Sequence, residues 1–332
     1  MQDQRWPLRC TRPKLRVTYL YLTAGLLLLL VGGELLVRGA VATAMRAGVS
    51  PLLIGLTLVG FGTSTPELLT SVEAALVGSP GIAVGNVIGS NIANIFLILG
   101  IAALICPLAV SKGAFYRDGT IAAFAALCGL AVCLSGELRP LAGFLLVGSL
   151  LAYVVFCYFT ERVDPDAPGL VVEPAAAVPG SIDMTLPVSV TMMSGGLVLT
   201  MLGAHLLVSS SLAIGHALGV SETVLGVTVV AVGTSLPELV TSVLAAIRRQ
   251  PDIAFGNIVG SNIYNILGIL GITAIIEPIP VPPEIVQADV WVMLAATALL
   301  LFFSVSGWRI SRPEGGIFLA SYVAYLVYVS TY

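Results

Sequence analysis

The stretch Gly62-Thr63-Ser64-Thr65-Pro66-Glu67 lies in the middle of an apolar run, and the chain repeats it as Gly233-Thr234-Ser235-Leu236-Pro237-Glu238. The two copies are 171 positions apart, counted from Glu67 to Glu238. A second polar motif follows each copy at the same distance, GNVIGSNIAN at 85–94 and GNIVGSNIYN at 256–265. Carboxylates, hydroxyls and amides are costly to place in the middle of a membrane. Their duplication therefore points to one functional site built from two related halves.

The composition is that of a membrane protein. The 332-residue chain is 57 % hydrophobic and only 10 % charged, and its mean hydropathy is +1.01. Globular domains carry about 25 % charged residues, so we expect an all-α polytopic membrane protein. A net charge of −3 gives no basic surface for nucleic acid. The five cysteines form no Cys-x-x-Cys pair, and there is no zinc-protease or P-loop motif. We therefore expect no enzyme, no cofactor and no coupling to ATP.

The apolar segments predict ten transmembrane helices, because a span needs about 20 mainly apolar residues. The expected spans are 17–40, 50–77, 82–105, 115–135, 139–160, 185–212, 221–248, 253–276, 286–305 and 311–331. Residues 161–184 are rich in proline and acidic residues and read as a linker. Residues 1–16 form a basic N-terminal tail. That tail is either a short cytosolic extension or not native, with translation starting at Val17.

The internal repeat decides the architecture. Ile54–Leu108 aligns with Leu225–Ile279 without a gap. We expect two five-helix halves, the first at 17–160 with repeat 1 at 50–105, and the second at 185–332 with repeat 2 at 221–276. An odd number of spans per half makes the second half insert upside down. Inverted repeats of this kind bind their substrate near the midplane, at the interface of the halves.

Lys and Arg residues indicate the orientation in the membrane. The loops after odd-numbered spans contain Arg38, Arg46, Lys112, Arg117, Arg162, Arg248, Arg249, Arg309 and Arg312. The opposite side contains Arg139 and the basic tail. Without the tail, the positive-inside rule places the odd-numbered loops in the cytoplasm and both chain ends outside. The tail contradicts this orientation, which is a further reason to doubt that it is native.

Each Gly-Thr-Ser-x-Pro-Glu motif predicts a broken helix. Proline has no N–H and clashes with the carbonyl four residues back, so carbonyls near Gly60 and Ala231 need another partner at membrane depth. Thr63 and Ser64 lie four and three residues before Glu67, which places all three on one helix face. A bound cation is one partner that would satisfy these groups.

The second motif adds serine and asparagine pairs four residues apart, Ser90 with Asn94 and Ser261 with Asn265. All of the donor atoms are oxygens, which hard cations such as Ca²⁺ and Na⁺ prefer, and two glutamates neutralise one divalent ion. The candidate cation-binding residues are therefore Glu67, Glu238, Asn94, Asn265, Thr63, Ser64, Thr234, Ser235, Ser90, Ser261, Gly60 and Ala231.

A structural role is the expectation for the other polar residues of the spans. A single hydroxyl in a membrane helix is usually structural, whereas Glu67 and Glu238 are mid-span and duplicated. We expect structural or supporting roles for Asn86, Asn91, Asn257 and Asn262, and interfacial or packing roles for Glu34, His205 and Glu73.

The two motifs together resemble those of the calcium/cation antiporter superfamily, specifically its sodium/calcium exchanger branch in a compact prokaryotic form. The resemblance covers nearly the whole chain. It implies that Glu67 and Glu238 bind Ca²⁺ at the centre and that Asn94 and Asn265 complete the site, although some prokaryotic members carry Asp at the position of Asn265. It also implies flanking Na⁺ sites from Thr63, Ser64, Ser90, Thr234, Ser235 and Ser261, with the carbonyls of Gly60 and Ala231.

The implied activity is secondary active antiport of Na⁺ against Ca²⁺ by alternating access, in the inner (plasma) membrane. The helices at 17–40 and 185–212 would slide past a rigid core, a monomer would suffice, and protons would compete for the glutamates. The proton/calcium exchangers of the superfamily carry glutamate at the position of Gly89 or Gly260, which favours Na⁺ coupling here. An H⁺/Ca²⁺ or other divalent cation/H⁺ antiporter of the same fold stays open. Duplicated broken helices disfavour an intramembrane enzyme or a channel.

Overall fold

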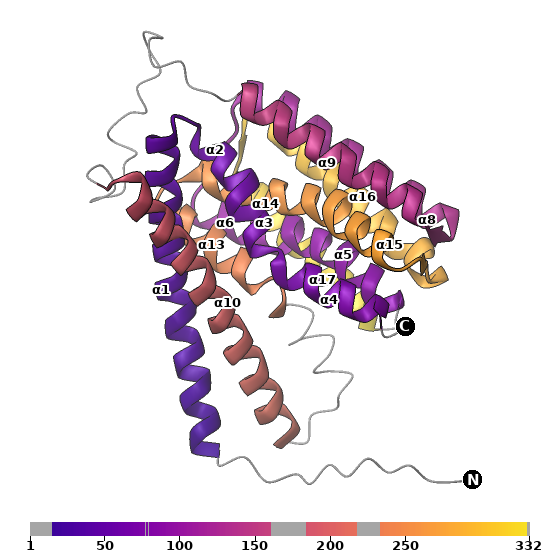
Figure 1. The fold of residues 1–332 in the computed structure, drawn as a ribbon, viewed down its shortest axis with the longest axis horizontal. Helices are drawn as coiled ribbons and strands as arrows, with labels where there is room; N and C mark the ends of the chain where they lie inside the picture. Colours follow the sequence, from indigo (N-terminus) through magenta and orange to yellow (C-terminus); the bar gives the residue numbers. More distant parts are fainter. Residues whose placement is uncertain (1–14, 77, 79, 161–183, 218–232, 331–332) are drawn as a thin grey trace.

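The computed structural model describes residues 15–76, 78, 80–160, 184–217 and 233–330, and this part of the chain is almost entirely helical (Figure 1). Labels with η denote π-helices. The first half contains α1 (Leu15–Ala47), α2 (Pro51–Ile54), η1 (Gly55–Val59), α3 (Gly60–Thr63), α4 (Thr65–Leu76), α5 (Pro80–Ala93), η2 (Asn94–Leu99), α6 (Gly100–Ile105), β1 (Leu108–Ala109), α7 (Lys112–Ala114), η3 (Phe115–Gly119), α8 (Thr120–Ser135), β2 (Glu137–Leu138) and α9 (Pro140–Thr160). The second half contains α10 (Leu186–Ala217), α13 (Leu236–Ile247), α14 (Pro251–Ile263), η6 (Tyr264–Leu270), α15 (Gly271–Ile276), β3 (Ile279–Pro280), η7 (Ile285–Asp289), α16 (Val290–Ser306), β4 (Arg309–Ile310) and α17 (Arg312–Ser330).

Seven described helices are long and apolar enough to cross a membrane, or eight if the bent pair Leu52–Thr63 and Thr65–Leu76 counts as one span. The all-helical polytopic fold is therefore confirmed, whereas the count of ten is not. The helix α13 covers the described part of the expected span 221–248, and α17 covers the last expected span. Most of the expected tail and linker, residues 1–14 and 161–183, lies outside the described residues.

The helices α1 and α10 run side by side along one edge of the bundle (Figure 1). Glycines allow their backbones to approach closely. A Cβ atom added to Gly203 would lie 2.6 Å from the backbone nitrogen of Leu29, and one added to Gly196 would lie 2.4 Å from that of Leu36. Small residues give membrane helices this close packing, so α1 and α10 form one paired unit beside the rest of the bundle.

The two Gly-Asn motifs lie in the most buried of the candidate spans. In Gly81–Ile105 and Pro251–Ile276, 72 % and 83 % of the most apolar window is buried inside the molecule. The other candidate spans have only 28–44 % of theirs buried. The duplicated polar residues are therefore surrounded by protein rather than by lipid.

Two short strand pairs connect the halves. The strand β1 pairs with β4, with Leu108 opposite Ile310, and β2 pairs with β3, with Leu138 opposite Ile279. Each pair is antiparallel and takes one strand from each half. The halves are thus joined twice by equivalent loop segments.

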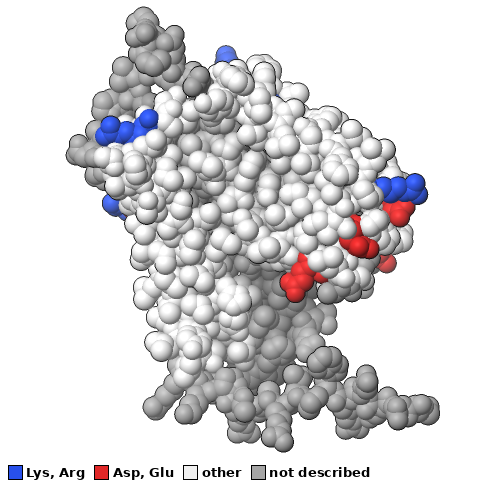
Figure 2. Space-filling model, in the orientation of Figure 1, with Lys and Arg blue, Asp and Glu red and all other residues white. Residues whose placement is uncertain are grey.

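Charged side chains are unevenly distributed. In the view of Figure 2, Lys and Arg appear at the upper left and the top, with a further basic side chain at the right edge, whereas Asp and Glu gather at the right and lower right. Among the described loop residues, Lys112 and Arg309 follow odd-numbered expected spans, and Glu277 and Glu284 follow an even-numbered one. This distribution agrees with the orientation expected from the sequence.

Glycines bring the second Gly-Asn helix against the first half. A Cβ atom added to Gly260 would lie 2.1 Å from the carbonyl oxygen of Leu56, and one added to Gly256 would lie 2.8 Å from that of Leu52. The helix α14 therefore lies directly against α2 and η1. Gly89, the equivalent of Gly260, lines a cavity of about 350 Å³, and residues 218–232, the equivalents of 47–61, lie outside the described part of the chain.

This close packing predicts the effect of a substitution. Gly260→Ala should lower the free energy of unfolding by about 1–3 kcal/mol, because the added methyl group overlaps the backbone of η1. Gly148→Ala in α9, where no described atom lies within 4 Å of an added Cβ, is the control and should not lower the thermal unfolding midpoint of the detergent-purified protein. Equal midpoints for the two variants would contradict the close packing of α14 on η1.

Candidate functional site

The first Gly-Thr-Ser-x-Pro-Glu motif breaks a helix, and in both motifs a helix starts just after the serine. In the first half, α3 ends at Thr63 and α4 starts at Thr65, and the two helical segments meet at 42°. Ser64, between them, has φ −82° and ψ 8°, and Ser235 has the similar values −89° and 11°. Proline is tolerated in the first turn of a helix, which is where both copies have it. As a result, Glu67 and Glu238 each lie in the first turn of a new helix.

The two glutamates are buried and are bound by serines of the opposite half. Each residue is only 1 % exposed. The Ser64 hydroxyl donates to Glu238 Oε1 at 2.7 Å, and the Ser235 hydroxyl donates to Glu67 Oε1 at 3.0 Å. These crossed hydrogen bonds correct one sequence expectation. Ser64 was expected on the same face as Glu67, but the helix breaks at Ser64, so its side chain contacts the other glutamate.

Hydroxyl and carbonyl groups continue the polar cluster on both sides. Ser235 Oγ lies 3.5 Å from Ser90 Oγ. The Gly60 carbonyl oxygen accepts a hydrogen bond from the Ser261 hydroxyl at 3.1 Å and lies 3.2 Å from Thr63 Oγ1. A carbonyl of the first half is therefore bound by a serine of the second half. Together these contacts join five candidate residues, Ser90, Ser235, Gly60, Thr63 and Ser261.

The two central asparagines are buried, and each leaves polar atoms without a hydrogen-bond partner. Asn94 and Asn265 are each 1 % exposed. Asn94 Nδ2 donates to Asn262 Oδ1 at 3.0 Å, whereas Asn94 Oδ1 and both polar side-chain atoms of Asn265 have no hydrogen bond. The π-helix η2, which begins at Asn94, packs on α13, and η6, which contains Asn265, packs on α4. Each asparagine is thus on a segment that touches the opposite half's glutamate helix.

The unpartnered oxygens define what this site can bind. Besides Asn94 Oδ1 and Asn265 Oδ1, they include Glu67 Oε2 and Glu238 Oε2. Buried polar groups normally have partners, and a buried carboxylate without an opposite charge is strongly unfavourable. No described Lys or Arg forms an ion pair with either glutamate. Two carboxylates and two amide oxygens fit a hard cation such as Ca²⁺.

The remaining candidate residues have different environments. Thr63 is fully buried, whereas Thr234 is half-buried and lines the cavity of about 350 Å³ together with Ser90. Ala231 lies outside the described residues. Thr63 and Thr234 are equivalent in sequence, and both lie beside residues of the polar cluster, Thr63 next to the Gly60 carbonyl oxygen and Thr234 next to Ser235.

Sequence reasoning did not single out Ser71 and Ser242. Each accepts a hydrogen bond from the first asparagine of the nearby Gly-Asn motif, Asn86 and Asn257 respectively. The available signal was their shared spacing of 171 residues, together with their position four residues after each glutamate. Asn86 and Asn257 themselves contact backbone and hydroxyl groups in the described structure, as expected for supporting residues.

Glu34 has a more specific role than the interfacial one expected. Its Oε1 lies 2.6 Å from Arg248 Nη2 and 2.5 Å from Arg38 Nε, and Arg248 Nε donates to its Oε2 at 2.9 Å. This ion pair joins α1 to the end of α13 and is separate from the glutamate site. Glu73 and His205 are exposed, in keeping with the sequence expectation.

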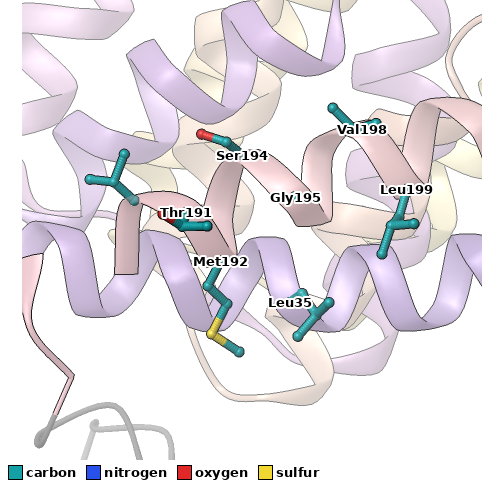
Figure 3. A pocket seen from close by; sticks show the side chains of 8 residues that line it. Leu35, Thr191, Met192, Ser194, Gly195, Val198 and Leu199 are labelled. Carbon is teal, nitrogen blue, oxygen red and sulfur yellow. The ribbon is translucent and has the colours of Figure 1, made fainter. Parts of the chain in front are cut away.

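A further cavity, of about 690 Å³, lies along α10 and is bordered by Leu35 of α1 (Figure 3). Its described lining is mainly apolar and includes Met192, Val198 and Leu199, with the hydroxyls of Thr191 and Ser194. None of the described candidate cation-binding residues borders it.

The family and sequence comparisons identify relatives along nearly the whole chain. The family model described as "Sodium/calcium exchanger protein" matches residues 17–159 and 188–331. The putative antiporter CaxA of Alkalimonas amylolytica is 36 % identical over 313 residues, which cover 93 % of this chain and 97 % of the relative. The sodium/calcium exchanger MaX1 of Methanosarcina acetivorans is 36 % identical over 342 residues, covering 94 % and 98 %.

Solved structures of the sodium-calcium exchanger NCX_Mj have a similar fold. One, from crystals soaked with 2.5 mM Na⁺ and 0.1 mM Ca²⁺, has a TM-score of 0.80 and 32 % sequence identity, and the match covers 94 % of this chain and 98 % of the other. Another, soaked with 10 mM Na⁺ and 10 mM Sr²⁺, has a TM-score of 0.81 at 31 % identity. The similarity extends over the complete helical bundle.

The site geometry predicts that both carboxylates are needed for Ca²⁺ binding. Glu67→Gln and Glu238→Gln keep a carbonyl oxygen for the serine hydrogen bond but remove one negative charge. We expect each to cost about 2–5 kcal/mol of binding free energy, which is about 30-fold or more in Kd. Calorimetric Ca²⁺ titration of the purified protein measures this. The exposed Glu73→Gln is the control, and an unchanged Kd in either buried variant would contradict the two-carboxylate site.

Proposed function

The chain belongs to the sodium/calcium exchanger family, and we propose that this cation/Ca²⁺ antiporter exchanges Na⁺ for Ca²⁺ at the site between its two halves. It is a multi-pass protein of the inner (plasma) membrane. One observation carries the proposal. Buried Glu67 and Glu238 are held by crossed hydrogen bonds from Ser235 and Ser64, and each keeps one oxygen without a partner. A site of this kind is neutral only when it holds positive ions.

We propose that Ca²⁺ binds between Glu67 and Glu238, with Asn94 and Asn265 as further ligands. Two negative charges match one divalent ion, and Ca²⁺ takes six to eight oxygens. The proposed Na⁺ ligands are the flanking hydroxyls of Thr63, Ser64, Ser90, Thr234, Ser235 and Ser261 with the carbonyl oxygens of Gly60 and Ala231. Because Ser64 and Ser235 bind the glutamates directly, Ca²⁺ and Na⁺ would share atoms, and binding of one would disfavour the other.

The proposed architecture has ten spans in two inverted halves, at 17–160 and 185–332, joined by the linker at 161–184. The family model matches each half separately, and the crossed contacts repeat at the spacing of 171 residues. Both observations support two related units that face each other across the site. A monomer contains the complete set of proposed ligands.

Alternating access is part of the proposal. The cavity of about 350 Å³ extends from Gly81, at the start of α5, to Ser90 and Thr234. The helices α1 and α10 pack on each other through Gly196 and Gly203. Movement of this α1–α10 pair would expose the site to each side of the membrane in turn.

Na⁺ is the proposed coupling ion because the position that is glutamate in proton/calcium exchangers is Gly89 or Gly260 here. Gly89 borders the cavity and Gly260 contacts a backbone carbonyl. Neither offers a carboxylate for a transported proton. Protons are instead proposed as competitors, since protonated Glu67 and Glu238 lose the charge that attracts Ca²⁺.

Uptake of ⁴⁵Ca²⁺ into proteoliposomes tests the coupling. Vesicles preloaded with Na⁺ and diluted into Na⁺-free buffer should accumulate ⁴⁵Ca²⁺, because Na⁺ leaving down its gradient drives Ca²⁺ inward. Uptake should fall by at least about tenfold in Glu238→Gln and should decrease as the external pH is lowered. A matched set carries only a pH gradient. Uptake in that set but not with Na⁺ would replace Na⁺ by H⁺ as the coupling ion.

A further inference from the structure

Asn86, the first asparagine of the first Gly-Asn motif, connects α5 to the glutamate helix α4. Its Nδ2 atom donates to the backbone carbonyl oxygen of Glu67 at 3.0 Å and to Ser71 Oγ at 2.9 Å. The two acceptors are four residues apart on α4, so they lie on one face of that helix. Asn86 therefore holds α4 at the turn that carries Glu67.

Asn257 makes the same connection in the second half. Its Nδ2 atom donates to the backbone carbonyl oxygen of Glu238 at 3.3 Å and to Ser242 Oγ at 2.9 Å. Asn257 and Ser242 are both fully buried. The contacts are those of Asn86 moved by 171 positions, so both halves use one arrangement to join the glutamate helix to the Gly-Asn helix.

The spacing along the Gly-Asn helices links these asparagines to the proposed ligands. Asn86, Ser90 and Asn94 are successive residues at intervals of four, and they therefore lie along one helix face. The first contacts the Glu67 backbone, and the other two are candidate ligands. Fixing Asn86 to that backbone consequently sets the separation between the Glu67 carboxylate and the ligands on α5 and η2.

Asn257 also reaches a candidate ligand of the other half. Its Oδ1 atom lies 3.1 Å from Thr63 Oγ1. Asn86 and Thr234, the corresponding pair, both line the cavity of about 350 Å³. Asn257 is thus in contact with one ligand-bearing segment of each half.

We propose that Asn86 and Asn257 are positioning residues for cation binding, each holding the first turn of a glutamate helix at the distance from the Gly-Asn helix that Ca²⁺ coordination requires. The inference rests on the proposed role of Glu67 and Glu238 as Ca²⁺ ligands. A bound ion demands that its ligands be held in place before binding. Removing the amide frees the first turn of the glutamate helix. A first turn has fewer backbone hydrogen bonds than the helix interior, so the helix itself restrains its position least.

Equilibrium ⁴⁵Ca²⁺ binding to the full chain in detergent tests the proposal. Asn86→Ala and Asn257→Ala should each raise the Kd by about 10–100-fold, the usual effect of losing a residue that orients a metal ligand. The matched control is Asn91→Ala. Asn91 belongs to the same motif and is buried, but its amide donates only to the carbonyl of Val87 in its own helix. We expect its Kd to stay within about threefold of the parent chain.

A second readout separates positioning from general stability. The thermal unfolding midpoint of the parent chain and of every variant is measured without ions and again at one fixed Ca²⁺ concentration. That concentration is chosen to saturate the parent chain. In Asn86→Ala and Asn257→Ala, Ca²⁺ should raise the unfolding midpoint much less than in the parent chain, because the size of that rise depends on Ca²⁺ affinity. This holds whether or not the substitution also changes the midpoint measured without ions. If Asn257→Ala does not fold, Asn86→Ala, whose side chain borders the cavity, decides the question.

The outcomes distinguish this proposal from the proposed function. A Kd within threefold of the parent in Asn86→Ala overturns the positioning role, as does an equal loss of affinity in Asn91→Ala. If the parent chain binds Ca²⁺ but does not exchange it for Na⁺, the proposed Na⁺ coupling is wrong. The Kd values of the variants then still test the positioning role of Asn86 and Asn257. A parent chain that binds no Ca²⁺ overturns both.

Discussion

The burial of two carboxylates at the interface of the two halves is the constraint on which the structure depends. Glu67 and Glu238 are each 1 % exposed, and the serine bound to each belongs to the opposite half. Buried charge is tolerated only when it is paired and hydrogen-bonded, and no described cationic side chain pairs with either glutamate. The halves must therefore meet to satisfy one oxygen of each carboxylate, and the proposed cation would satisfy the others.

Helix starts and close glycine packing make this arrangement possible. The helices that start just after Ser64 and Ser235 place the glutamates in first turns, where proline is compatible with the helix. Gly260 lets η1 lie against α14. The glutamate helix and the Gly-Asn helix of one half can therefore reach the other half closely enough for direct hydrogen bonds.

The apolar segments were sufficient to predict the all-helical membrane fold, and the duplicated motifs singled out Glu67 and Glu238, which the structure brings together with serines of the opposite half. The motifs could not predict the crossed hydrogen bonds. Ser64 and Glu67 would share a face only in a continuous helix, and the helix is interrupted at Ser64. The ion pair between Glu34 and Arg248 joins residues 214 positions apart and follows no local periodicity.

A structure of the Ca²⁺-loaded protein, with the ion located by its anomalous scattering, tests the central claim most directly. The account predicts one strong Ca²⁺ peak bound by oxygens of both Glu67 and Glu238, with Ca²⁺–oxygen distances of about 2.3–2.6 Å. It also predicts that the peak weakens when Na⁺ is added in excess. Ca²⁺ bound elsewhere, or bound by only one of the two glutamates, would contradict a single cation site shared by the two halves.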